Sequence, residues 1–136
     1  MDQQHDSGQH ERLRASPSER FAGASHAFDV RAVVRVLRAE AHPAERGHRQ
    51  VTIFHRAPVT QIVFACEPGG ALADHTAHGL VMMHVVEGRL TVRTDEGDDA
   101  LSAGYVLVLT PDVHYDVHAL EASALLLTVH LDGTAR

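Results

Sequence analysis

The sequence contains a single cysteine, no long apolar run and few basic residues in its second half. Because Cys66 stands alone, an internal disulfide framework and a zinc site built from several cysteines are both excluded. No stretch of the 136 residues has the length and apolar character of a membrane span. The first residues lack the basic region and the apolar run of a secretory signal. We therefore expect a cytoplasmic location and no membrane partner.

The small number of basic residues in the second half argues against binding to nucleic acids. From Val51 onward, eleven acidic residues stand against four arginines, in a chain of formal net charge −6. Binding to nucleic acid requires clustered cations that neutralise phosphates. We therefore expect no nucleic-acid partner.

The first 40 residues divide into two segments of different character. Residues 1–25 are rich in Gln, Ser, Arg and Glu and have no apolar period, which predicts a disordered tail. Beyond it, Asp29 is a candidate N-cap, and apolar residues then recur at helical spacing, at Val30, Val33, Val34 and Leu37. This pattern predicts one short helix over about 29–40, ending before Pro43. A chain of this size forms one core, so we expect residues 26–136 to be a single domain.

The remainder of the chain has the rhythm of an all-β protein. After Gly47, runs rich in β-branched and aromatic residues recur about every 8–12 residues, with turn signals between them. This spacing predicts an antiparallel sandwich or barrel over about 48–132, with the short helix packed outside it. Barrel edges and an amphipathic helix leave apolar surface that so short a chain covers poorly, which favours a homodimer.

Six of the 12 histidines fall between positions 75 and 130. Histidine is the commonest protein ligand of transition metals, and a catalytic metal typically takes three protein ligands and keeps one position open. His75 and His78 precede one predicted strand, and another carries His114 and His118. If the two strands are neighbours, His75, His78 and one histidine of the second strand can bind the same metal ion.

Side-chain alternation adds a constraint, because successive residues of a strand face opposite sides. If Tyr115 and Val117 face the core, then His114 and His118 face outward. In the preceding strand, Val81, Met83 and Val85 face inward and His84 outward, or the reverse if the strand is phased oppositely.

Two glycine-punctuated segments carry a family resemblance. The first runs from Gly70 through His75 and His78 and an apolar strand to Gly88. The second runs from Gly104 through an apolar strand to Pro111, His114 and His118. Their order resembles the two motifs of the cupin superfamily, and the likeness covers roughly residues 47–131. It implies an antiparallel jelly-roll barrel whose two motifs line the mouth and supply the ligands of one metal ion.

Position by position, the resemblance admits two alignments. Strict counting places His75 at the first histidine of the first motif, Ala77 at the second and Val81 at its glutamate, while Tyr115 takes the histidine position of the second motif. Slips of one residue instead bring His78 and His114 into ligand positions. The second alignment predicts a divalent transition metal (Zn, Fe or Mn) held by His75, His78 and His114.

The resemblance leaves two classes of function open, because cupins include metal-dependent oxygenases, isomerases and cyclases as well as proteins without catalysis. One hypothesis is a metal-dependent enzyme acting on a small organic molecule at the barrel mouth. The other is a metal-free, non-enzymatic module that binds or senses a small ligand. Both place the small molecule in one predicted pocket, lined by His75, Val81, Met83, Val85, Tyr115 and Val117.

Overall fold

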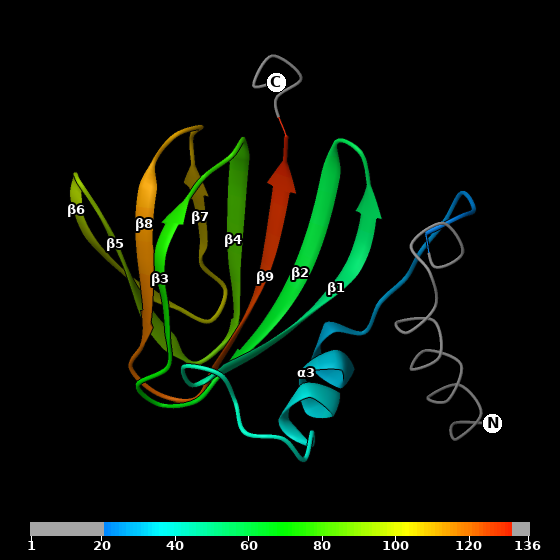
Figure 1. Cartoon of the computed structure of the whole chain (residues 1–136), viewed down its shortest axis with the longest axis horizontal. Helices are drawn as coiled ribbons and strands as arrows, with labels where there is room; N and C mark the ends of the chain where they lie inside the picture. The colour runs from blue at the N-terminus through cyan, green and yellow to red at the C-terminus, as the bar shows by residue number, and fades with distance from the viewer. Residues whose placement is uncertain (1–20, 132–136) are drawn as a thin grey trace.

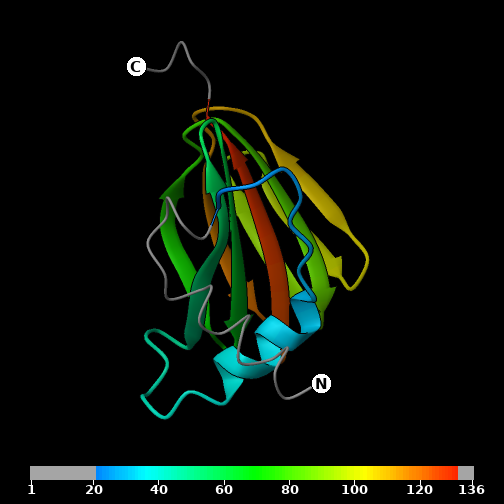
Figure 2. The ribbon, with the colours of Figure 1, turned by 90° about the vertical axis from the view of Figure 1, so that its right-hand side faces the viewer.

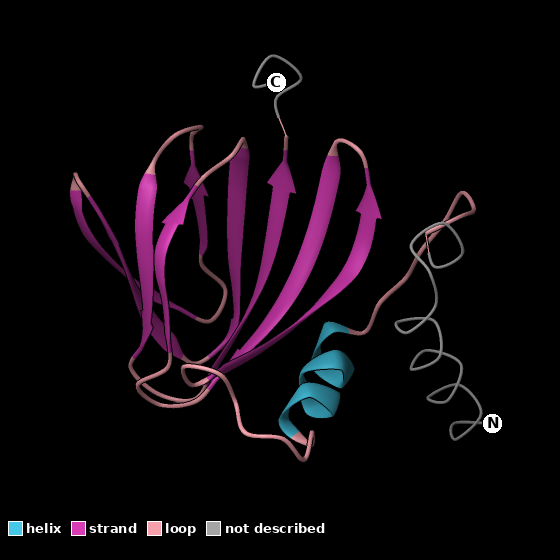
Figure 3. Cartoon of the chain, viewed as in Figure 1, coloured by secondary structure: helices cyan, strands magenta, loops and turns pink. Residues whose placement is uncertain are grey.

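The computed structural model describes residues 21–131, apart from the side chain of Asp74, and in that range it forms two antiparallel sheets and one helix (Figure 1, Figure 3). Sheet A has the strand order β1-β2-β9-β4-β7. Its strands are β1 (His48–Arg56), β2 (Val59–Cys66), β4 (Leu80–Glu87), β7 (Val106–Leu109) and β9 (Ser123–His130). Sheet B has the order β3-β8-β5-β6. Its strands are β3 (Ala71–Thr76), β5 (Arg89–Thr94), β6 (Gly97–Ser102) and β8 (His114–Ala119).

The strand order is that of a jelly roll. Apart from the hairpins β1–β2 and β5–β6, the chain passes from one sheet to the other between successive strands. Strands β2, β9, β4 and β7 of sheet A therefore lie over β3, β8, β5 and β6 of sheet B, and β1 extends sheet A at one edge. The predicted all-β antiparallel fold with a helix outside it is confirmed.

Two strands were not expected from the sequence pattern. β3 contains alanine, aspartate and histidine, and β6 begins with Gly97 and two aspartates, so neither shows the β-branched run that marks the other strands. Both form because they pair with stronger strands, β3 with β8 and β6 with β5. Residues 95–96 form the turn of the β5–β6 hairpin, and β6 begins directly after it at Gly97.

The main core lies between the sheets and is built from inward-facing residues at alternate positions. In β4, Val81, Met83 and Val85 are buried while His84 is exposed, which decides the phase that the sequence left open. In β8, Tyr115 and Val117 are buried and His114 and His118 exposed, as alternation predicts. One face of each strand thus meets the opposite sheet.

Helix α3 (Val30–Arg38) packs across the outer face of sheet A (Figure 2). The side chain of Asp29 caps it by accepting a hydrogen bond from the backbone N–H of Ala32 at 3.1 Å. Its buried residues, Val33, Val34 and Leu37, form a second core with residues of β1, β2 and β9. The predicted helix is therefore confirmed, with ends one or two residues inside the predicted ones. Within residues 21–131 no helix has the length and apolar character needed to span a membrane.

The segment before the helix is also packed. Phe21 is buried, with its ring 5.6 Å from that of Phe54 on β1. The Arg56 guanidinium donates hydrogen bonds to the carbonyl oxygens of Phe21 and Gly23. Only residues 21–25 of the disordered tail predicted over 1–25 belong to the described part of the chain. Residues 1–20 lie outside the described range.

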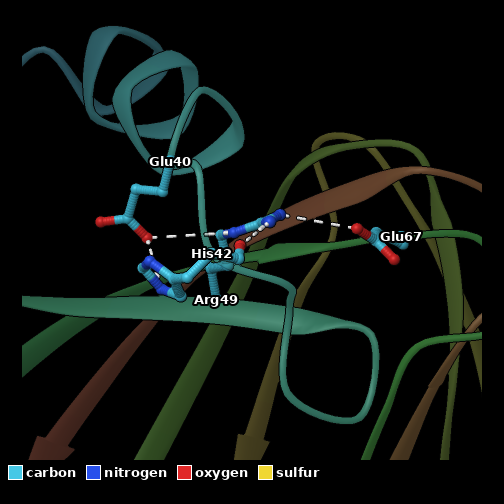
Figure 4. A network of polar contacts seen from close by, with 4 residues as sticks. All are labelled: Glu40, His42, Arg49 and Glu67. Carbon is cyan, nitrogen blue, oxygen red and sulfur yellow. Dashed lines mark hydrogen bonds and ion pairs between the residues drawn. The ribbon is translucent and has the colours of Figure 1, made fainter.

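Arg49 on β1 holds the linker between α3 and β1 against the barrel (Figure 4). Its guanidinium donates to the His42 carbonyl oxygen at 2.6 Å, and lies 3.5 Å from a Glu67 carboxylate oxygen and 3.9 Å from one of Glu40. The His42 imidazole is 3.5 Å from the same Glu40 oxygen. One half-buried cation thereby connects the linker, β1 and the turn between β2 and β3.

Candidate functional site

A cavity of about 310 Å³ opens between the two sheets on the side where β1 and β3 form their edges. Its lining combines apolar side chains from both inner faces with a few polar ones. The lining residues are Gln50, Thr60, Ile62, Phe64, Leu72, His75, Thr76, His78, Val81, Met83, Tyr115, Leu127, Val129 and Leu131. Such a cavity, apolar with a few polar groups, has the character of a small-molecule site.

The sheet A wall is made by strand register. Ile62 of β2 pairs with Leu127 of β9, and Leu127 also pairs with Met83 of β4, so the three side chains form one row across the inner face. In the next row, Val129 of β9 lies between Thr60 and Val81. These cross-strand rows give the cavity a mainly apolar wall.

The sheet B wall carries the two polar rings of the cavity, His75 and Tyr115, whereas Gln50 and Thr60 are polar residues of the sheet A wall. A register irregularity between Leu72 and His75 in β3 brings His75 directly opposite Tyr115 of β8. The two rings lie side by side, with centroids 5.7 Å apart and planes inclined by 31°. Tyr115 is buried and His75 is exposed, so the tyrosine lies deeper in the wall than the histidine.

His78 is positioned by a loop that is anchored on both sides. The backbone N–H of Ala77 donates to the Val113 carbonyl at 2.9 Å, and the Ala77 carbonyl accepts from the Asp112 N–H at 2.8 Å. The next residue, Gly79, has φ of +151°, and a Cβ there would lie 2.3 Å from the carbonyl oxygen of His130. Only glycine allows the loop to lie this close to the end of β9, which holds His78 at the cavity.

Burial controls the chemistry of Tyr115. Removal from water disfavours the phenolate and raises the pKa of the Tyr115 hydroxyl above its ordinary value. At neutral pH the group is therefore a neutral phenol, which can donate one hydrogen bond and accept others. Such a phenol is a hydrogen-bonding group and a poor base.

Cys66 gives no nucleophile to this site. The side chain is buried at the end of β2, and burial raises its pKa from 9.0 to about 11, against a smaller opposing effect of the charge on Arg38. Because the thiolate is the reactive form, a thiol with such a pKa is inert at neutral pH. Cys66 is therefore a packing residue of the core.

The three predicted metal ligands are not gathered at one point. His75 and His78 line the cavity, whereas His114 is exposed on the other face of β8, with its Nδ1 3.1 Å from the Thr76 hydroxyl. Among the described side chains, no group of three or more histidine, cysteine, aspartate or glutamate residues is arranged to hold a metal ion. These side chains offer two imidazoles, and do not by themselves fit a metal with three protein ligands.

The predicted pocket residues fall into two sets. His75, Val81, Met83 and Tyr115 line the cavity. Val85 and Val117 face the same interior and are almost fully buried, but they belong to the adjacent core and not to the cavity wall.

Several lining residues were missed at the sequence level, because most lie outside the two motifs and the two in β3 lie on a strand that the sequence pattern did not predict. They are Gln50, Thr60, Ile62, Phe64, Leu72, Thr76, Leu127, Val129 and Leu131. The alternation of β2 and β9 could have identified Ile62, Phe64, Leu127 and Val129 as inward-facing. It could not have told which of them meet a cavity.

Comparison with solved structures shows a cupin fold. A cupin superfamily protein from Desulfitobacterium hafniense superposes with a TM-score of 0.65 at 11% sequence identity, covering 82% of this chain and 95% of that one. An RmlC-like cupin from Shewanella frigidimarina gives a TM-score of 0.64 at 16% identity, over 82% of this chain and 94% of the other. The small cupin domain implied by the two motifs is therefore confirmed as a fold.

A third solved structure of the same fold is KdgF from a Halomonas species. It superposes with a TM-score of 0.60 at 18% identity, over 68% of this chain and 88% of that one. No protein-family model and no curated protein sequence matches the chain. At these identities the similarity establishes the fold, and the function must be argued from the site.

Proposed function

We propose that this cupin domain binds a small, largely apolar organic molecule in the cavity between its sheets, as a metal-free, non-enzymatic binding or regulatory module. The observation that carries the proposal is the cavity itself, whose apolar wall from sheet A faces His75 and Tyr115 on sheet B. Its volume of about 310 Å³ is at the lower end of the roughly 300–1,000 Å³ of small-molecule sites. A ligand of this size is a compact molecule, and His75 and Tyr115 suit one polar end on it.

The polar end would be recognised on the β3 and β8 side. Tyr115 supplies a neutral phenol there, and His75 and His78 supply imidazoles that both donate and accept when neutral. A carbonyl, hydroxyl or carboxyl group on the ligand suits these three groups. The rest of the ligand would contact Ile62, Met83 and the other apolar residues of sheet A.

The test is a titration with 1-anilinonaphthalene-8-sulfonate, an apolar fluorescent probe with one acidic group. Met83 is fully buried and lines the cavity, so Met83→Trp should fill the space and weaken probe binding at least tenfold. The added volume should cost about 1–3 kcal/mol of stability, so the variant remains folded.

The matched control is the neighbouring residue. Met82 lies on the opposite face of β4 and does not line the cavity, so Met82→Trp should leave probe affinity unchanged. Probe binding that is equal in the two variants would place the ligand elsewhere on the protein.

The metal-dependent hypothesis remains a separate prediction, favoured by the two imidazoles on one cavity wall. A Zn, Fe or Mn ion would be detected by elemental analysis of the purified protein. If the hypothesis is correct, metal is stoichiometric in the wild type and lost in His75→Ala, but retained in His84→Ala, whose histidine is exposed on the outer face of β4. A wild-type protein that contains no metal and still binds the probe would refute the metal-dependent hypothesis and support the binding module.

A further inference from the structure

A second groove lies on the side of the sandwich where β6 and β7 form the edges of the two sheets. It has a volume of about 700 Å³ and is separate from the ligand cavity in all of its lining residues. One wall is β7 with the loop that follows it, and the other is the tip of the β5–β6 hairpin. The groove floor contains Leu107, Leu109 and Val113.

The β7 wall is an unprotected strand edge. In the described part of the chain, β7 pairs with β4 on one side and ends sheet A on the other. Residues 104–110 contain no charged residue and no proline, which are the usual means of protecting an edge. Val106 and Val108 are 57% and 50% exposed, so apolar side chains stand along this edge.

The hairpin wall is strongly acidic. Four carboxylates of the groove belong to this hairpin, Asp95, Glu96, Asp98 and Asp99, and a fifth, Asp112, lies in the loop after β7. The lining contains no arginine. Asp98 forms an ion pair with Arg93 at 3.1 Å. The groove therefore combines free backbone hydrogen-bonding groups on one side with negative charge on the other.

We propose that this groove binds an extended, basic peptide segment of a partner protein, which adds as a strand to the free edge of β7. Backbone groups of β7 would supply the hydrogen bonds, as in other cases of strand addition. Alternate residues of an added strand face opposite sides. Apolar residues of the peptide would then lie beside Val106 and Val108, and its cationic residues would face the carboxylates of the hairpin.

Charge also argues against a second copy of this chain as the occupant. Symmetric pairing of β7 with β7 would bring two identical sets of carboxylates to one edge, and like charges in proximity disfavour association. A basic segment instead gains from the same carboxylates.

The first experiment uses a capped, fluorescently labelled hexapeptide of alternating arginine and valine, followed by fluorescence anisotropy. It should bind, and its affinity should fall as salt is raised, because exposed charges are screened. The same peptide with glutamate in place of arginine should not bind. Absence of binding by the arginine peptide overturns the proposal.

Val108→Lys places a charge on the edge and should weaken binding of the arginine peptide at least tenfold. Leu120→Lys is the matched control, because Leu120 is also 50% exposed but lies outside the groove, and it should leave the affinity unchanged. Equal affinity in both variants would mean that the peptide binds without using the edge, which refutes strand addition.

A second pair of variants tests the acidic wall without altering β7. The double variant Asp95→Asn, Asp99→Asn should lower the affinity for the arginine peptide at least fivefold. The control double variant Glu45→Gln, Glu121→Gln makes the same change in net charge outside the groove and should have little effect on the affinity.

Light scattering tests the alternative occupant. If Val108→Lys converts a dimer to a monomer, the occupant is a second copy and the peptide proposal fails.

Discussion

At the scale of single residues, two buried titratable groups, Cys66 and Tyr115, connect packing to pH. Both lie in the main core, and burial raises the pKa of each. The folded protein therefore holds these protons at a pH at which the unfolded chain has released them. Stability contributed in this way is complete below the ordinary pKa and is lost as the pH rises above it.

The unfolding free energy should accordingly decline in alkaline solution. For Cys66 the loss begins near pH 9 and is complete near the folded pKa of about 11, a span of two pH units worth about 3 kcal/mol. Tyr115 adds a further decline that begins near pH 10. Denaturant unfolding of the protein measured between pH 7 and pH 10.5 would follow both.

The variant Cys66→Ala separates the two residues. It should lower stability at pH 7 through lost packing, yet show a shallower decline from pH 9 upward. A decline as steep as that of the wild type would mean that the thiol is already accessible to water in the folded state.

At the scale of elements, helix α3 shows how a short, arginine-rich segment becomes part of the fold. Nine residues form too short a helix to be stable alone in water, even with the cap supplied by Asp29. The helix persists because Val33, Val34 and Leu37 pack on the outer face of sheet A. Its stability is therefore a property of the interface.

Leu37→Ala should remove about 2–5 kcal/mol of the unfolding free energy, because it leaves a cavity in that interface. The adjacent Val36 is 43% exposed, so Val36→Ala is the control and should change stability by less than about 0.5 kcal/mol. Chemical denaturation monitored by circular dichroism would compare the two. Similar losses in both variants would show that burial of Leu37 is not what holds the helix on the sheet.

At the scale of the whole molecule, the sandwich is open along two sides. The ligand cavity lies between the edges β1 and β3, and the acidic groove lies between β6 and β7. In Figure 1 the β5–β6 hairpin forms the left edge of the molecule, and α3 lies at the lower right. The two proposed binding sites therefore share no lining residue.

The exposed apolar side chain of Val36 on α3 supports the prediction of a homodimer. Light scattering at micromolar concentration should give the mass of two chains. If the helix face is the contact, Val36→Glu should reduce this to one chain, because it places a charge in the interface, and Leu120→Glu should not. A wild-type mass of one chain refutes the dimer.

Local periodicity accounts for much of what could be predicted. A strand buries alternate residues wherever it lies, so the inward orientation of Tyr115 and Val117 followed from the sequence. The helix followed in the same way from its apolar spacing and from Asp29. These features depend on neighbours within a few residues along the chain.

Other features depend on pairing between distant segments, which no local pattern encodes. β3 and β6 are strands because β8 and β5 bind them, and the irregularity in β3 that sets His75 opposite Tyr115 exists only in that pairing. In the same register His114 faces away from the cavity, and Val85 lies in the core behind the cavity wall. Packing of two sheets selects one register by its total burial, so the position of a site within that packing emerges only with the tertiary structure.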